Sequence, residues 1–291
     1  LKMVTTSQWS YSEPMSDKEP QSRGVSKMAD KKQNAVAEQK TAKVIQFDPS
    51  MFEGDAGVGL ENMGQEDLAL PFLKILSGMS KELDDLEEAR KGDIYNTVSG
   101  QVYKGKEGIK VIPVAYQRRF IQWAPLGEGT GAPVAIYAPG EIKPETKRDD
   151  TDQREYVTDG SGQYIEETHQ HYVLIVNEDK SIETALIAMK VTQLKKSRKW
   201  NSMISSLTMQ GKNGPFTPPR FSHIYHLKTV SEENSKGSWH GWEMSRVGPV
   251  EDMATYQRAK DFAKSITDGE VVVKHQDDNG SSSESSDNIP F

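Results

Sequence analysis

The fold is decided by the stretch Ile109-Lys110-Val111-Ile112-Pro113-Val114-Ala115-Tyr116-Gln117-Arg118-Arg119-Phe120-Ile121-Gln122-Trp123. Its β-branched and aromatic residues predict a single long strand over 109–123. Pro113 predicts a bulge or an edge position, because proline cannot donate to a strand ladder. Long, bent strands of this kind are typical of small barrels. Strict alternation places two sets of side chains on opposite faces: Val114, Tyr116, Arg118 and Phe120 on one, and Ala115, Gln117, Arg119, Ile121 and Trp123 on the other.

Other β-rich runs lie on both sides of this strand, separated by turn residues. The predicted strands are 72–76, 94–98, 101–103, 134–137, 164–176, 182–189, 221–230 and 238–247. The first of these also satisfies helical spacing, so a helix is the competing interpretation there. No alternation of strand and helix is present, which argues against a doubly wound fold.

Two helices complete the prediction. One begins with Thr192 as N-cap and runs to about Met209, and the last begins at Pro249. The sum is a mainly β protein, an antiparallel barrel of the OB-fold type with two helices. A β-sandwich is the alternative.

Composition divides the chain into three parts. Residues 1–46 are polar and lack a strand or helix period, so we expect a disordered segment, within which Met15 and Met28 are candidate start sites. We expect residues 47–270 to form one domain, with a loop-rich insertion at about 125–163. Residues 271–291 are expected to be a disordered acidic tail.

The overall composition excludes several classes of protein. No cysteine is present, which excludes disulfides and thiolate metal sites and fits a reducing compartment. No apolar run approaches the ~18 residues of a membrane span, and the start shows no signal peptide. We therefore expect a cytoplasmic protein without a membrane partner.

Charge is strongly segregated along the chain. The net charge is −7, yet no acidic residue occurs between Glu183 and Glu232. That basic window carries a charge of +8, from Lys190, Lys195, Lys196, Arg198, Lys199, Lys212, Arg220 and Lys228. Phosphate contacts dominate affinity for nucleic acids, so this pattern favours binding of an anionic polymer over a merely solvated face.

Aromatic residues interleave with these positive charges, as single-strand binding requires. Each unpaired base offers a flat face that can stack on an aromatic ring without reading sequence. The predicted DNA-binding residues are Tyr103, Tyr116, Arg118, Arg119, Phe120, Trp123, Lys190, Lys195, Lys196, Arg198, Lys199, Lys212 and Arg220. About half of the aromatic candidates, which also include Phe216, Phe221 and Tyr225, should instead be core, and Trp200 fits a helical core stripe.

Catalytic interpretations are weaker. His169 with His171, and His223 with His226, have spacings that can bind metal, but no carboxylate motif accompanies them, so structural roles are favoured. The glycine-rich run 127–131 lacks the helix and Lys-Ser/Thr of a phosphate loop. We expect neither enzymatic activity nor a cofactor.

The chain ends in an apolar tip on an acidic segment. The last sixteen residues contain no basic residue and include Asp277, Asp278, Glu284 and Asp287, followed by Asn288-Ile289-Pro290-Phe291. This tip resembles the C-terminal tip of bacterial and phage single-stranded DNA-binding proteins, although Asn288 stands where an acid is common. The predicted partner-binding residues are Asp287, Ile289, Pro290 and Phe291.

Four internal segments widen this resemblance: 70–76 (LPFLKIL), 92–97 (GDIYNT), 114–119 (VAYQRR) and 196–200 (KSRKW). Together they are similar to a family of bacteriophage single-stranded DNA-binding proteins, over roughly residues 60–270 and the tip. The resemblance implies an OB-fold core that coats single-stranded DNA without sequence preference in phage replication, recombination and repair. It also implies a tip that recruits replication or recombination proteins, and leaves a homo-oligomer open.

The tail has an opposite charge to the basic window. We therefore expect it to occupy the same groove when DNA is absent and to be displaced when DNA binds. Two alternatives come from other classes: a phage structural or scaffold protein, and a metal-dependent nuclease.

Overall fold

The computed structural model describes residues 49–63, 67–235, 237–271, 273 and 275. Contacts divide the chain into two units, residues 1–56 and 57–291. Within the described part of the first unit lies a 3₁₀ helix, η1 (Pro49–Asp55). The expectations for the N-terminal segment and for the partner-binding tip fall on residues outside the described ranges.

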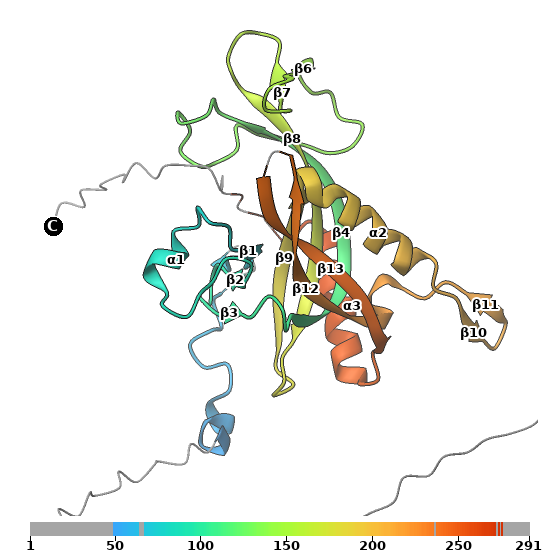
Figure 1. The fold of residues 1–291 in the computed structure, drawn as a ribbon. Coiled ribbons are helices and arrows are strands. Elements are labelled where there is room, and N and C mark those ends of the chain that lie inside the picture. The colour runs from blue at the N-terminus through green and yellow to red at the C-terminus, as the bar shows by residue number, and fades with distance from the viewer. Residues whose placement is uncertain (1–48, 64–66, 236, 272, 274, 276–291) are drawn as a thin grey trace, which may run out of the picture. The chain divides into compact units, whose positions relative to one another are not determined.

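The second unit is mainly antiparallel β, as predicted (Figure 1). Its described strands are β1 (Leu73–Ile75), β2 (Ile94–Asn96), β3 (Val102–Tyr103), β4 (Ile109–Trp123), β5 (Ala135–Tyr137), β6 (Thr146–Arg148), β7 (Glu155–Val157), β8 (Tyr164–Val176), β9 (Ile182–Lys190), β10 (Met209–Gly211), β11 (Gly214–Phe216), β12 (His223–Asn234) and β13 (Gly237–Pro249). The strand interpretation of 72–76 is confirmed, and β4 has the predicted bounds. The small hairpins β6–β7 and β10–β11 were not predicted.

The two predicted helices are present with different starts, and the first ends at Ser205 rather than near Met209, which begins β10. α2 (Leu194–Ser205) follows a 3₁₀ turn, η3 (Val191–Gln193), so its N-cap is Gln193 rather than Thr192. α3 (Met253–Thr267) is capped by Asp252, whose Oδ2 accepts a hydrogen bond from the Thr255 amide at 2.6 Å. The prediction that Pro249 opens this helix is wrong, because Pro249 ends β13. The shorter elements are α1 (Glu82–Asp85) and η4 (Arg220–Ser222).

The connectivity of the main sheet is that of an OB-type barrel. The sheet order is β13-β12-β4-β8, with β9 paired to the other edge of β8. Counting only these five strands along the chain, the order is 5-4-1-2-3, and α2 connects the third strand to the fourth. A five-stranded Greek-key arrangement of this kind curls into a partly open barrel. The long connection from β4 to β8 holds β5, β6 and β7, which lie at the far end of the two strands (Figure 1).

A bulge in β4 changes which side chains share a face. Pro113 pairs with Val173 and Ala115 with Tyr172, so Val114 is the extra residue. Val114 therefore packs in the same cluster as Ala115, and the prediction that Val114 shares a face with Tyr116 is wrong. Beyond the bulge the alternation is as predicted, because Tyr116, Arg118 and Phe120 pair in turn with His171, His169 and Glu167. The predicted bulge at Pro113 is confirmed.

Two apolar clusters cover opposite faces of the sheet. The inner cluster includes Val173 and Ile187 and packs against Trp200 and Ile204 of α2. The outer cluster includes Leu174 and Leu186 and packs against Ala259 and Ile266 of α3. Because both faces of β8 are covered, nearly all of its residues are buried, and they do not alternate between buried and exposed.

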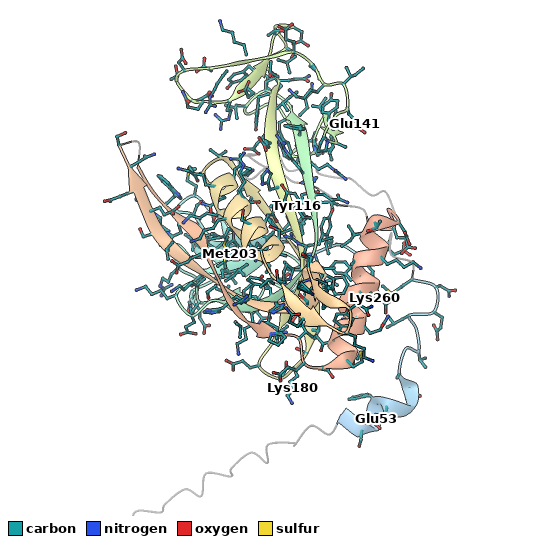
Figure 2. All side chains as sticks on the ribbon, turned by 90° about the vertical axis from the view of Figure 1, so that its right-hand side faces the viewer. Glu53, Tyr116, Glu141, Lys180, Met203 and Lys260 are labelled. Carbon is teal, nitrogen blue, oxygen red and sulfur yellow. The ribbon has the colours of Figure 1, made fainter. Side chains whose placement is uncertain are left out.

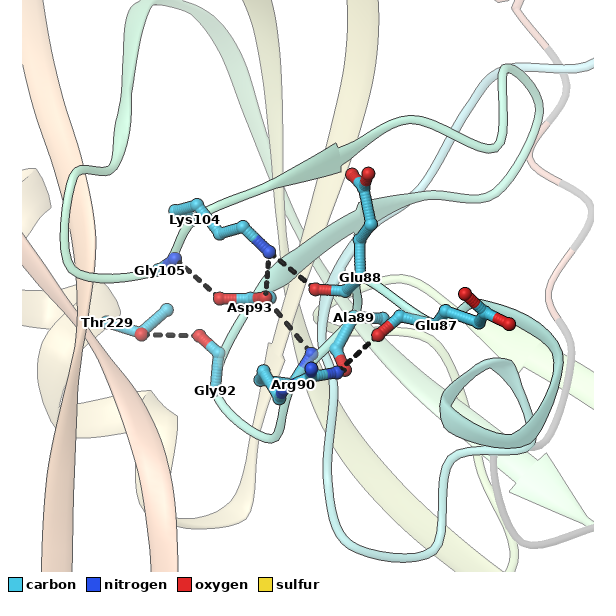
Figure 3. A network of polar contacts seen from close by, with 9 residues as sticks. All are labelled: Glu87, Glu88, Ala89, Arg90, Gly92, Asp93, Lys104, Gly105 and Thr229. Carbon is cyan, nitrogen blue, oxygen red and sulfur yellow. Dashed lines mark hydrogen bonds and ion pairs between the residues drawn. The ribbon is translucent and has the colours of Figure 1, made fainter. Parts of the chain in front are cut away.

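A second, three-stranded sheet joins the barrel at a tight polar contact (Figure 3). The buried Asp93 carboxylate accepts hydrogen bonds from the Gly105 amide at 3.0 Å and from Lys104 Nζ at 3.3 Å. The Thr229 hydroxyl of β12 donates to the Gly92 carbonyl at 2.5 Å. This joint fixes β1–β3 against β12. In the described part of the chain, no helix is long and apolar enough to cross a membrane.

Candidate nucleic-acid interface

The inner face of β4 carries an arginine–aromatic surface beside α2. We define the α2 surface as Tyr116, Arg118, Phe120, Glu167 and Arg198. Figure 2 shows Tyr116 midway along the long ribbon of β4 and β8, with Met203 on the neighbouring α2. The register places Tyr116, Arg118 and Phe120 on this face in succession. The α2 surface therefore unites residues from two predicted segments, the long strand and the basic window.

Its centre is a carboxylate surrounded by positive groups. Arg118 Nε lies 2.9 Å from Glu167 Oε1, and Arg198 Nη2 lies 3.7 Å from the same oxygen. The Arg118 guanidinium lies 4.9 Å from the centroid of the Phe120 ring, the geometry of a cation–π contact. The side chains of Arg118 and Arg198 are 44% and 61% exposed, so both can reach a ligand.

Behind this surface a chain of hydrogen bonds runs into the core. Arg220 Nη2 donates to His171 Nδ1 at 2.9 Å, which leaves His171 Nε2–H to donate to Ser197 Oγ at 2.7 Å. Ser197 Oγ–H then donates to His169 Nδ1 at 2.7 Å, and His169 Nε2–H donates to Glu167 Oε1 at 2.9 Å. Because arginine has no acceptor, the direction of every bond and both histidine tautomers follow from this arrangement.

His169 and His171, the two histidines of this hydrogen-bond chain, are neutral at physiological pH. Burial lowers the pKa of His171 well below its usual value, with the Arg220 charge acting in the same direction. Burial also lowers the pKa of His169, although the hydrogen bond to Glu167 opposes it. A neutral pair is what the hydrogen-bond directions require. The structural role favoured for His169 and His171 is thus supported by their contacts.

Arg220 and Trp200 lie inside this part of the molecule. Arg220 also donates to Asn201 Oδ1 at 2.9 Å and lies 5.6 Å from the Tyr116 ring centroid. Burial lowers the pKa of Arg220 to about 10, so it stays charged. Trp200 is fully buried and stacks on His171 at a centroid distance of 4.7 Å. Arg220 therefore supports the surface from behind, and Trp200 belongs to the core, as its helical stripe indicated.

Fewer lysines of the basic window are available to a ligand than the sequence implies, because glutamates from other strands form ion pairs with several of them. Lys190 lies 3.2 Å from Glu166 and Lys196 lies 2.5 Å from Glu232. Lys228 lies 3.0 Å from Glu243. Among the described residues, no carboxylate pairs with Lys195, Lys199 or Lys212, and all three are exposed. Glu166 and Glu167 stand outside the window in sequence, so counting charges along the chain does not reveal the pairs.

The remaining predicted residues lie elsewhere. Arg119, Trp123 and Lys190 point to the outer face, where Trp123 is buried with Ile121 and Tyr164. The half-buried Arg119 donates to Gln117 Oε1 at 2.7 Å. Tyr103 lies on β3 and packs against the inner cluster, and burial raises its pKa to about 12. The predicted residues are thus divided among the two faces of the main sheet, α2, η4, the β10–β11 hairpin and the small sheet.

Sequence reasoning missed three residues of the α2 surface and its support. Glu167 and Ser197 carry the hydrogen-bond chain, and Lys143 of the long connection lies 5.6 Å from the Phe120 ring centroid. Alternation in 164–176 could have placed Glu167, His169 and His171 on one face. Nothing in the sequence placed Ser197 between the histidines, since that depends on how α2 docks.

The described residues contain no group of three or more His, Cys, Asp or Glu side chains that could hold a metal ion. His223 hydrogen-bonds to Ser222 Oγ at 2.8 Å, and His226 to the Glu107 carbonyl at 2.6 Å. These side chains have local structural partners and do not converge.

The fold and this surface define a β-barrel protein of the OB type with an arginine–aromatic face. Comparison with family models goes further, since the model of the Pam3 phage gp34-like protein family matches residues 23–272. The chain belongs to that phage protein family. No curated protein and no solved structure matches it.

Proposed function

We propose that this protein binds single-stranded DNA without sequence preference during phage DNA replication, recombination and repair. The observation that carries the proposal is the contact of Arg118 with Phe120, with Arg198 converging on the same carboxylate. An aromatic ring beside two guanidinium groups offers a base a stacking partner and a phosphate its counter-charge. Membership in a phage family and the OB-type connectivity support the same function.

Glu167 shows how an anion would be held. Its carboxylate contacts Arg118, Arg198 and His169 at one oxygen. A phosphate oxygen has the same charge sign and accepts the same hydrogen bonds. A bound strand would compete with Glu167 for the two arginines, while Lys195 and Lys199 on α2 add charge without a carboxylate to displace.

Fluorescence anisotropy with labelled oligo(dT) tests the proposal. We expect binding at low salt that is weakened about tenfold or more in an Arg118→Ala/Arg198→Ala double variant, because two phosphate contacts are lost. The matched control is Arg258→Ala/Lys260→Ala, which removes two exposed charges from α3 (Lys260 is labelled in Figure 2).

The dependence of DNA affinity on salt concentration is a second test of the proposal. Five phosphate contacts, from the two arginines and Lys195, Lys199 and Lys212, predict a slope of about −3.5 for log affinity against log salt concentration on a single strand. Absence of binding at low salt, or equal affinity for duplex DNA, would refute the function.

The acidic tip extends this proposal to partners. We propose that Asp287, Ile289, Pro290 and Phe291 recruit replication or recombination proteins, and that the tail competes with DNA for the basic residues. Deleting 276–291 should tighten DNA binding at low salt and abolish capture of the partner. An unchanged DNA affinity in the deletion would remove the competition from the proposal.

A further inference from the structure

A cavity of about 260 Å³ lies on the side of the barrel away from the α2 surface. It lies beside β9, whose outer edge meets the segment leading into β1 at a single bridge between Phe72 and Leu186. Trp123, Trp242 and Phe72 contribute aromatic walls. Ala188 of β9 also lines it, and its methyl group fills little of the space. The predicted site residues Trp123 and Lys190 therefore meet here, although they are remote from Arg118.

Two polar atoms of the lining residues have no partner. The described part of the chain has six buried side-chain nitrogen or oxygen atoms without a hydrogen-bond partner. Two of them, Thr168 Oγ1 and His240 Nδ1, belong to residues that line this cavity. Thr168 is only 2% exposed. Buried polar groups usually have hydrogen-bond partners in native proteins, and a ligand with polar atoms in the cavity would supply partners for these two.

We propose that the cavity takes up a single nucleobase from a bound DNA strand. This inference rests on the proposed function and adds to it a specific pocket for one base. The walls offer ring faces for stacking, and Thr168 and His240 offer hydrogen-bonding atoms to the polar edge of the base.

Size and charge both suit this ligand. Drug-sized ligands occupy pockets of about 300–1,000 Å³, so the cavity has room for one ring system rather than for several nucleotides. Lys74 and Lys190 also line it, are 30% and 28% exposed, and pair with Glu82 and Glu166. A backbone phosphate would compete with these carboxylates for an ammonium group. His275 adds a neutral ring: Gln170 Nε2 donates to its Nε2 at 2.7 Å, and burial lowers its pKa to about 4.

Thr168→Val removes the unpartnered hydroxyl with little change of shape. We expect oligo(dT) affinity to fall about fivefold through loss of one hydrogen bond to the base, while the unfolding midpoint stays the same or rises. Thr229→Val is the matched control. It removes the hydroxyl that donates to Gly92, so it should lower the unfolding midpoint without changing affinity.

Ala188→Leu closes the cavity by a different route. We expect it to lower oligo(dT) affinity by about 5- to 150-fold, the loss of one stacked base, and to leave affinity for a strand of abasic residues unchanged. If the wild type binds oligo(dT) and both cavity variants bind it equally well, the base pocket is refuted while DNA binding stands. If the wild type binds no oligonucleotide, both proposals fail.

Discussion

Glu167 decides how tightly the α2 surface can hold a phosphate. Its carboxylate occupies the position between Arg118 and Arg198 that a backbone phosphate would need. A glutamine keeps an acceptor oxygen for His169 Nε2–H but removes the charge. The surface is therefore expected to bind DNA more tightly without the native carboxylate.

Glu167→Gln should tighten oligo(dT) binding about three- to tenfold at low salt, because two exposed ion pairs no longer compete with phosphate. Equilibrium titration measures this. The matched control is Glu243→Gln, which changes the net charge equally and releases Lys228 on β12. Equal tightening in both variants would show a general charge effect rather than competition at the α2 surface.

Ser197 is the residue on which the hydrogen-bond chain depends. It is fully buried, donates to His169 and accepts from His171. Ser197→Ala leaves two buried imidazole nitrogens without partners, and we expect the free energy of unfolding to fall by about 2–4 kcal/mol. Urea denaturation measures it. Ser202→Ala on the exposed side of the same helix should cost far less, and equal losses would contradict the role of the chain.

At the scale of elements, the joint between the small sheet and β12 leaves no space at Gly105. A Cβ there would lie 2.0 Å from the Gly92 carbonyl oxygen and 2.3 Å from Thr229 Oγ1. Gly105→Ala should therefore lower the free energy of unfolding by about 1–3 kcal/mol through overpacking. Gly78→Ala is the control, because nothing lies within 4 Å of a Cβ at Gly78. Thermal unfolding that does not distinguish the two variants would contradict the close contact.

The sequence predicted elements better where a local period was strong. β4, β8, β9 and both helices follow from periodicity and composition, since their apolar faces match the layers that cover them. The start of α3 was misplaced because proline suits a helix start, whereas here the sheet ladder extends to Pro249 and Asp252 provides the cap. The β10–β11 hairpin carries no apolar alternation, so local sequence did not indicate it.

The candidate site was predictable only in part. Tyr116, Arg118 and Phe120 share a face because strand geometry requires it. That Glu166, Glu167 and Glu232 would reach across to Lys190, Arg198 and Lys196 depends on strand pairing and helix docking, which distance in sequence does not encode. The cavity also depends on tertiary structure, since its lining residues come from seven separate segments between Phe72 and His275.

At the scale of the whole molecule, buried neutral histidines make stability depend on pH. Burial lowers the pKa of His275 to about 4, with Lys190 and Arg119 acting in the same direction, and it lowers those of His169 and His171. The ordinary pKa of histidine in an unfolded chain is about 6.5. Below that pH the unfolded chain therefore binds more protons than the folded protein does. The stabilisation is present above that pH and is lost as the pH falls toward the folded pKa values.

We expect the free energy of unfolding to drop between pH 7 and pH 5, with about 2 kcal/mol of the loss due to His275. Urea denaturation at the two pH values measures the drop. His275→Gln keeps an acceptor for Gln170 but cannot titrate, so its drop should be smaller. An identical drop in the variant would assign the pH dependence to other groups.

Because of the bulge at Val114, the face on which each later side chain of β4 lies depends on whether the number of residues before it is odd or even. One extra residue reverses the faces of everything that follows it, so Arg118 faces α2 and Arg119 faces the outer side. A strand of the same length without the bulge would exchange the two arginines and turn Tyr116 away from His169 and His171. A single-residue insertion or deletion between Val114 and Trp123 is therefore expected to survive in relatives only together with the gain of a second bulge or the loss of this one.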